Sequence, residues 1–428
     1  MGERWGLRWP GDEAARARAA QPTPGQLEGA GGGPHRFIEG DNLPVLQALG
    51  PSLAGQVRIA YLDPPYNTGT AMRYADRFAA PSRAWTEAHG EDAWGQRHAA
   101  WLSFMWPRLV LVRALLAPDG VLFASIDDRE THHLRMLLDA AFGEANFVGT
   151  VVWRKRVVRG RGARHLLPQT EHIHVYARDA TRLPAFEEPL TDAMRAAYDA
   201  RDEAGPYKLL PLAKSGTAHS PRPNLVYPIQ APDGSWIACP THQWRWSQET
   251  LEARRDELVF RRGRDGAWRI YTKQRLLLPD GERGRTPTTY YDRATTADGT
   301  AEVKALFGRP VLDFPKPVRL IKDLIGWATP RGGRRDEVVL DPFAGTCPTA
   351  QAVLELNAED GGARRFVCIQ APEALKDPEF ETIAALARAR IAHTCARLGV
   401  PVEAVAQQRW VPGLFDRRDE VAGCERGV

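Results

Sequence analysis

Residues 61–69 read YLDPPYNTG and directly follow the apolar stretch VRIA. The apolar run predicts a buried strand, and the prolines predict a stiff loop at its end, because each ring fixes φ and removes an N–H donor. In this loop Asp63 can accept hydrogen bonds, Pro64 and Pro65 can hold a carbonyl outward, and Tyr66 offers a flat face. These features suit the exocyclic amine of a nucleobase, whose lone pair stays delocalised until its N–H groups are hydrogen-bonded. A proline-rich surface turn is the alternative.

A second motif lies near the other end of the chain. Residues 337–340, EVVL, predict a strand, residues 341–346 read DPFAGT, and residues 349–356 predict a helix. A strand, a glycine-containing turn and a helix together form the usual cradle for a nucleotide-like cofactor, and Gly345 would let the backbone approach it. An ordinary strand-to-helix turn would look the same. Two such motifs, each after an apolar strand, favour a single site built from both.

The order of the motifs resembles the β-class DNA amino-methyltransferases, in which a DPPY motif precedes the FxG motif of the S-adenosylmethionine site. Within that class the chain is most like the modification subunits of type III restriction systems. The likeness extends to residues 37–43 (FIEGDNL), 120–128 (GVLFASIDD) and 314–322 (FPKPVRLIK), and it covers about residues 36–395.

The resemblance implies roles for individual residues. The catalytic set is Asp63, Pro64, Pro65 and Tyr66. The set implied for S-adenosylmethionine binding is Asp41, Asn42, Asp63, Lys316, Asp341, Pro342, Phe343, Ala344, Gly345, Thr346 and Gln370. For Asp41 and Asn42 the N-cap of a helix is an equal alternative. Gln370 stands where an acid commonly binds the ribose, with Glu373 as the nearby carboxylate.

The cofactor loop departs from the family at one point. Cys347, followed by Pro348, stands where such families usually carry a second glycine. Cys347 has a Cβ and Pro348 lacks an N–H, so we expect a loop that is reshaped around these two residues.

The pattern of the chain predicts an α/β fold. Short apolar strands alternate with amphipathic helices in residues 36–153 and 306–400, which predicts a mostly parallel sheet covered on both faces. The resemblance implies a Rossmann-like, circularly permuted methyltransferase sheet of seven strands. Residues 154–305 are rich in Pro, Trp, Tyr and Arg, and we expect a β-rich target recognition insert there. Residues 1–35 predict a flexible arm and residues 401–428 a tail.

A run of basic residues follows the first α/β stretch. Its members are Arg154, Lys155, Arg156, Arg159, Arg161 and Arg164, and residues 151–165 contain no acid. We expect this run to bind DNA phosphates, and a solvated charge run is the alternative.

Composition limits the class of protein further. The chain has 428 residues, of which 43% are hydrophobic, and a net charge of only +4. No apolar run approaches the roughly 20 residues that span a bilayer, so we expect no membrane segment. The five cysteines lack a paired-ligand spacing, which fits a reducing cytoplasm. We expect no metal, because His132, His133, His172 and His174 lack a further ligand at metal spacing.

The sequence therefore predicts an S-adenosylmethionine-dependent methyltransferase that modifies adenine N6 of a flipped-out base in double-stranded DNA. Cytosine N4 is one alternative, and Asp63 in place of serine favours adenine within the family. RNA or protein substrates are disfavoured by Asp63 and by the long insert. A catalytically inactive DNA-recognition subunit is the alternative from another class. The resemblance also implies a homodimer and a separate restriction or helicase subunit as a partner.

Overall fold

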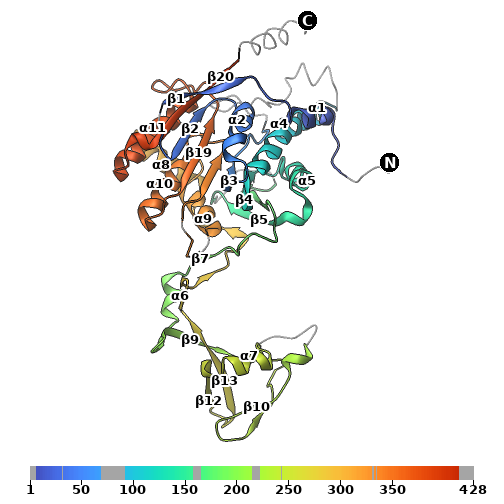
Figure 1. Ribbon diagram of the computed structural model, residues 1–428, viewed down its shortest axis with the longest axis vertical. Helices are drawn as coiled ribbons and strands as arrows, with labels where there is room; N and C mark the ends of the chain where they lie inside the picture. The colour runs from blue at the N-terminus through green and yellow to red at the C-terminus, as the bar shows by residue number, and fades with distance from the viewer. Residues whose placement is uncertain are drawn as a thin grey trace. The chain divides into compact units, whose positions relative to one another are not determined.

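The computed structural model describes residues 6–30, 32–68, 92–157, 165–214, 222–241, 243–329, 332–333 and 335–413. The chain divides into two compact units (Figure 1). The first comprises Met1–Glu187 and Thr286–Val428, and the second comprises Glu188–Arg285.

The first unit is built on a sheet of ten strands. In their order across the sheet they are β1 (Gly25–Ala30), β20 (Val405–Pro412), β2 (His35–Glu39), β19 (Arg365–Gln370), β18 (Val338–Asp341), β3 (Val57–Leu62), β4 (Leu116–Ile126), β6 (Thr170–Ala177), β5 (Phe147–Arg154) and β17 (Tyr290–Tyr291). All run in one direction except β1 and β6. The predicted mostly parallel sheet is confirmed.

The predicted count of seven strands is wrong, and the two edge strands, β1 and β17, give weak sequence signals. β17 has only two residues, and β1 reads GQLEGA, in which glycine lowers strand propensity. β1 pairs antiparallel with β20, from Gly25 opposite Pro412 to Ala30 opposite Gln407. The described part of the predicted arm therefore holds β1 and helix α1 (Asp12–Arg18), and the predicted tail holds β20.

Helices cover both faces of this sheet, as Figure 1 shows. One face carries α2 (Asn42–Leu53), α4 (Asp92–Leu115) and α5 (Thr131–Phe142), and the other carries α9 (Val318–Ala328), α10 (Pro348–Asp360) and α11 (Ile383–Leu398). Alternate residues of β3 serve the two faces: Ala60 and Leu62 pack with the first group, and Ile59 and Tyr61 with the second. Helix α8 (Thr296–Phe307) packs beside α11. Short 3₁₀ turns lie at η1 (Glu144–Asn146) and η4 (Val402–Ala404).

The second unit is β-rich. Its antiparallel sheet has the order β12 (Leu258–Arg262), β13 (Trp268–Arg275), β9 (Gly205–Pro211) and β8 (Ala200–Asp202). The two-stranded pairs are β7 (Glu188–Pro189) with β16 (Gly284–Arg285), β10 (Ile229–Gln230) with β11 (Trp236–Ile237), and β14 (Leu277–Leu278) with β15 (Gly281–Glu282). The helical turns are α6 (Asp192–Ala196), η2 (Pro223–Leu225), α7 (Gln248–Ala253) and η3 (Arg255–Glu257). Its core contains Leu212, Ile229, Trp244, Leu251 and Ile270.

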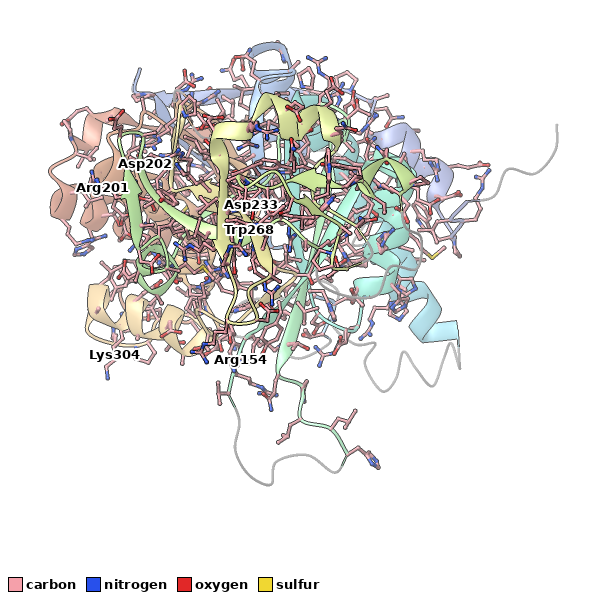
Figure 2. The ribbon with its side chains drawn as sticks, turned by 90° about the horizontal axis from the view of Figure 1, so that it is seen from below. Arg154, Arg201, Asp202, Asp233, Trp268 and Lys304 are labelled. Carbon is pink, nitrogen blue, oxygen red and sulfur yellow. The ribbon has the colours of Figure 1, made fainter. Side chains whose placement is uncertain are left out.

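This unit, Glu188–Arg285, spans fewer residues than the predicted insert of residues 154–305. The chain on either side of it returns to the first unit, because β6 and β17 pair into the large sheet and α8 packs against α11. Within the second unit, Figure 2 labels Asp233 and Trp268, whose side chains meet: Trp268 Nε1 donates to Asp233 Oδ2 at 3.0 Å. Among the described residues, none of the helices is long and apolar enough to cross a membrane.

Candidate active site

The two sequence motifs meet at the carboxyl ends of two central strands of the large sheet. β3 and β18 are parallel neighbours, with Val339 opposite Ile59 and Leu340 opposite Ala60. Because parallel strands end at the same edge, the DPPY loop and the DPFAGT loop lie side by side. A cavity of about 540 Å³ opens between them.

This cavity brings most of the predicted residues together. Its lining includes Asp63, Pro64, Pro65, Tyr66, Lys155, Arg156, Lys316, Asp341, Phe343, Ala344, Gly345, Thr346 and Gln370. Asp41, Asn42, Pro342 and Arg154 lie outside the lining. Arg159, Arg161 and Arg164 fall outside the residues that the structure describes.

Asp63 and Tyr66 share one buried hydrogen-bond network. The hydroxyl of Tyr66 lies 2.8 Å from Asp63 Oδ1 and 3.0 Å from Glu171 Oε2. Lys316 Nζ donates to Asp63 Oδ1 and to the Tyr66 hydroxyl, both at 2.8 Å, and lies 3.4 Å from Glu171 Oε2. Lys155 Nζ adds an ion pair with Glu171 Oε1 at 3.0 Å. Two carboxylates and two ammonium groups therefore alternate along one wall of the cavity.

The charges of this network support one another. Burial alone would lower the pKa of Lys316, but the carboxylates of Asp63 and Glu171 outweigh it and raise that pKa. Burial likewise opposes ionisation of Glu171, yet Lys316 and Lys155 hold its pKa below the usual value. We therefore take both buried groups to be charged, each compensated by its neighbours.

Two residues of this network add to the sequence analysis. Lys316 was predicted to bind the cofactor; its ammonium contacts Asp63 and Tyr66 of the catalytic motif, and its contact with a cofactor stays a prediction. Glu171 was not predicted at all. It is the second residue of β6, and an acid at the start of a strand has no local signature, so only the pairing of β6 with β4 reveals it.

The backbone of the DPPY loop is fixed from the helix side. Trp101 Nε1 on α4 donates to the carbonyl of Pro65 at 2.7 Å. Of the two proline carbonyls in this loop, that of Pro65 is therefore engaged within the protein. The first loop is thus held by side chains at both its carboxylate and its backbone.

The second loop is organised around Asp341. Its carboxylate accepts from Thr349 Oγ1 at 2.5 Å and from the backbone N–H of Phe343 at 3.0 Å. Burial, aided by the negative charge of Asp63, raises the pKa of Asp341 to about 7. Gln370 Oε1 accepts from the backbone N–H of Gly345 at 2.7 Å, so this predicted ribose ligand also shapes the loop.

Glycine and cysteine give this loop two left-handed residues. Gly345 has φ +53, and a Cβ built there would meet no atom within 4 Å, so the space beside it is open. Cys347, the N-cap of α10, has φ +59 and is fully buried. Cys347 thus takes up the left-handed conformation that glycine adopts readily. Reshaping of the loop around Cys347 and Pro348 stays a prediction.

Asp41 and Asn42 lie behind the second loop. Asp41 is the N-cap of α2 and accepts from the N–H of Leu43 at 2.9 Å, as the capping alternative predicted. Asn42 Nδ2 donates to the carbonyl of Pro342 at 2.8 Å. Arg108 bridges both, to Asp41 Oδ1 at 2.8 Å and to Asn42 Oδ1 at 2.5 Å. Their contact with a cofactor stays a prediction.

The described part of the basic run begins at the end of β5 (Arg154 in Figure 2). Arg154 Nη2 lies 3.5 Å from Asp292 Oδ2, and Arg156 Nε donates to the carbonyl of Pro168 at 2.7 Å. Lys155 pairs with Glu171, as described above. The run is therefore partly engaged within the protein.

Comparison with known proteins identifies the family. Residues 57–377 match the family model for N6/N4 enzymes described as DNA methylase. The chain belongs to this family. It is 33% identical over 386 residues to the Mod subunit of the type III restriction-modification enzyme StyLTI of Salmonella typhimurium, covering 85% of this chain and 57% of that protein.

Two further relatives are similar. The Mod subunit of the type III enzyme EcoPI of Escherichia phage P1 is 31% identical, over 87% of this chain and 64% of that protein. The type II methyltransferase M.KpnI of Klebsiella pneumoniae is 30% identical, over 77% of this chain and 79% of that protein. The methylase chain thus spans 57% and 64% of the length of the two type III relatives.

We predict that Asp341 makes the stability of this methylase depend on pH. A carboxyl group whose pKa is raised to about 7 on folding binds more protons in the native state, so its contribution to stability falls as the pH rises. Between pH 5.5 and 8 the free energy of unfolding should decline by about 2 kcal/mol from this group alone. Urea unfolding of wild type and Asp341→Asn at both pH values measures it. A variant as pH-dependent as the wild type would contradict the raised pKa.

Cys347 provides a test of the loop conformation. At φ +59, alanine keeps the left-handed strain of a Cβ whereas glycine relieves it, and both variants lose the same sulfur. We expect Cys347→Gly to unfold with a free energy about 1 kcal/mol higher than that of Cys347→Ala. This reverses the usual order of the two residues. Equal or greater stability of the alanine variant in urea titrations would rule out the left-handed geometry.

Proposed function

We propose that this methylase transfers a methyl group from S-adenosylmethionine to N6 of adenine in double-stranded DNA. The observation that carries the proposal is the single cavity bounded by the carboxylate of Asp63 on one side and by the glycine loop of Gly345 on the other. Membership of the DNA methylase family supports the reaction class.

The cavity fits a cationic nucleoside cofactor. Asp63 and Asp341 both line it, and burial, aided by the charge of Asp63, raises the pKa of Asp341, so a bound cation would favour its ionised form. Gly345 leaves open space beside the loop, Phe343 supplies an aromatic surface, and Gln370 offers an amide. These residues would hold S-adenosylmethionine, which would supply an electrophilic methyl group on a sulfonium cation.

The residues of the DPPY loop would prepare the acceptor amine. Asp63 uses Oδ1 for Lys316 and Tyr66, so Oδ2 is the oxygen that would accept a hydrogen bond from the target N–H. The Asp63 side chain is 26% exposed, which leaves it open to a ligand. A second hydrogen bond to the carbonyl of Pro64 would localise the lone pair of the amine. The ring of Tyr66 would stack on the base, its hydroxyl held by the network.

Lys316 and Glu171 would act through Asp63 and Tyr66. The ammonium of Lys316 donates to Oδ1 of Asp63, which fixes this carboxylate and directs Oδ2 to the target amine. Glu171 balances that ammonium and fixes the hydroxyl of Tyr66. Such positioning matters because a reacting group displaced by about 1 Å can lose a hundredfold in rate.

DNA recognition would draw on the remaining parts. The target base would leave the duplex to reach the loop, at a cost of a few kcal/mol. Arg154 and Arg156 would contact phosphates near the cavity. We propose that Glu188–Arg285 recognises the target sequence. This is supported by its exposed Trp236 and by basic groups such as Arg262, which lies 4.4 Å from the ring centroid of the partly exposed Trp268.

The choice of adenine over cytosine N4 rests on aspartate at the first motif position. A homodimer and a separate restriction or helicase subunit are the partners that the type III relatives suggest. Single-molecule sequencing of DNA from cells that express the protein would report the modified base and its site together. N4-methylcytosine would redirect the proposal, and unmodified DNA despite bound cofactor would favour a catalytically inactive recognition subunit.

We predict that Asp63→Ala abolishes methyl transfer while cofactor affinity changes by less than about threefold, because Asp63 would contact the acceptor amine. Transfer of tritiated methyl groups and calorimetric titration of S-adenosylmethionine measure the two effects. Thermal unfolding controls for the loss of the buried partner of Lys316. Activity within tenfold of wild type would contradict the catalytic role.

We predict that Arg154→Ala combined with Arg156→Ala weakens DNA binding about equally for all sequences. Each lost phosphate contact should reduce the slope of log affinity against log salt by roughly 0.9. Lys155 is left intact because it neutralises Glu171. The exposed Arg18 on α1 provides the control, as Arg18→Ala. An unchanged slope in fluorescence-anisotropy titrations would mean that the run is only a solvated surface.

A further inference from the structure

Glu130 lies between β4 and α5, and its side chain is completely buried. It occupies the N-cap of α5, but its carboxylate does not cap the helix and turns inward instead. There it accepts three hydrogen bonds: from Asn67 Nδ2 at 2.5 Å, from His98 Nδ1 at 2.5 Å and from His133 Nδ1 at 2.7 Å. We propose that Glu130 is a positioning residue that holds the DPPY loop in its active shape through Asn67. This inference rests on the proposed methyltransferase function.

Asn67 is the residue through which the loop would be held. It follows Tyr66 directly, is fully buried and has φ +56, a left-handed conformation that asparagine tolerates better than most residues. Its Oδ1 is buried and has no hydrogen-bond partner among the described residues. The bond from Nδ2 to Glu130 is therefore the polar contact that orients this side chain, and with it the end of the loop.

Helix α4 fastens the same loop at two points. Trp101 donates to the carbonyl of Pro65, and His98, one turn earlier on the same helix face, reaches the loop through Glu130 and Asn67. His133 secures Glu130 from α5. Hydrogen bonds thus fix the loop relative to two helices that pack on the sheet. A rigid scaffold can position a catalytic segment in this way.

The protonation states are consistent with this network. Burial would raise the pKa of Glu130, but hydrogen bonds from His133 and Asn67, together with His98, hold it below its usual value. The ionised carboxylate only accepts, so Oε1 takes two N–H groups and Oε2 takes one. A neutral imidazole with its proton on Nδ1 satisfies each histidine contact.

The same side chains raise the question of a metal. His98, Glu130 and His133 each offer a ligand atom, and these atoms lie within 4.8 Å of one another. The sequence analysis missed this cluster because His98 lies 32 residues before Glu130, although Glu130 and His133 are only three residues apart. The nitrogen–oxygen separations of 2.5 and 2.7 Å, however, are those of hydrogen bonds. Ligands about 2.0–2.1 Å from a tetrahedral zinc ion stand more than 3 Å apart. The geometry favours the hydrogen-bonded network.

The test compares Glu130→Gln with the exposed control Glu144→Gln. Glutamine keeps the volume but places an N–H₂ group against donors, so at least one contact is lost. We expect kcat to fall about 10- to 100-fold while KM for the cofactor changes less than about threefold. Hydrogen–deuterium exchange of the peptide that contains residues 63–67 should quicken in Glu130→Gln and stay unchanged in the control.

Asn67→Ala tests the route from Glu130 to the loop. If Glu130 acts through Asn67, the double variant should lose no more activity than the less active of the two single variants. A kcat within threefold of wild type in Glu130→Gln, or single effects that multiply, would overturn the proposal. So would one zinc ion per chain whose removal by chelator speeds exchange of the loop. The exchange measurement needs no activity, so a wild-type protein that transfers no methyl group would refute the proposed function separately.

Discussion

The rest of the candidate site depends on the ion pairs that the ammonium of Lys316 forms. This ammonium joins Asp63 after β3, Glu171 on β6 and its own segment before α9, three pieces of chain far apart in sequence. A buried ion pair adds little net stability compared with well-packed apolar side chains of similar volume. Removing one partner, however, leaves an uncompensated charge at a cost of about 3–5 kcal/mol. The alternation of acid and base from Asp63 to Lys155 therefore acts as a unit. Its value is a fixed geometry at Asp63 and Tyr66.

The pairing of β3 with β18 explains why the motif order along the chain does not matter to the site. The two strands are neighbours in the sheet, and both end at the edge where open α/β sheets bind ligands. One site forms whether the catalytic loop comes first or last in the sequence. In the sequence, the unit Glu188–Arg285 lies between the DPPY motif and the DPFAGT motif.

Sequence reasoning succeeded where the signal is local. The DPPY and DPFAGT loops have rigid or flexible residues at fixed offsets, and the strands before them are short apolar runs, so their positions could be predicted. It failed where a residue gains its role only through tertiary pairing. Glu171 and Glu130 are ordinary acids at a strand start and a helix start, and the contact of Lys316 with Asp63 joins two segments far apart in the sequence. β1 was missed because its glycines suggest flexibility, although pairing with β20 orders it.

The two sides of the cavity differ in how their negative charge is compensated. Asp63 and Glu171 are matched by Lys316 and Lys155. Among the described residues, Asp341 receives only a hydroxyl and a backbone N–H, and burial raises its pKa to about 7. The acid without an ammonium neighbour among the described residues therefore lies on the glycine-loop side of the cavity. By reciprocity, a cation that lowers the pKa of Asp341 is itself bound more tightly once Asp341 is ionised. Charge alone would thus direct a cationic cofactor to one wall and leave the neutral acceptor base to the other.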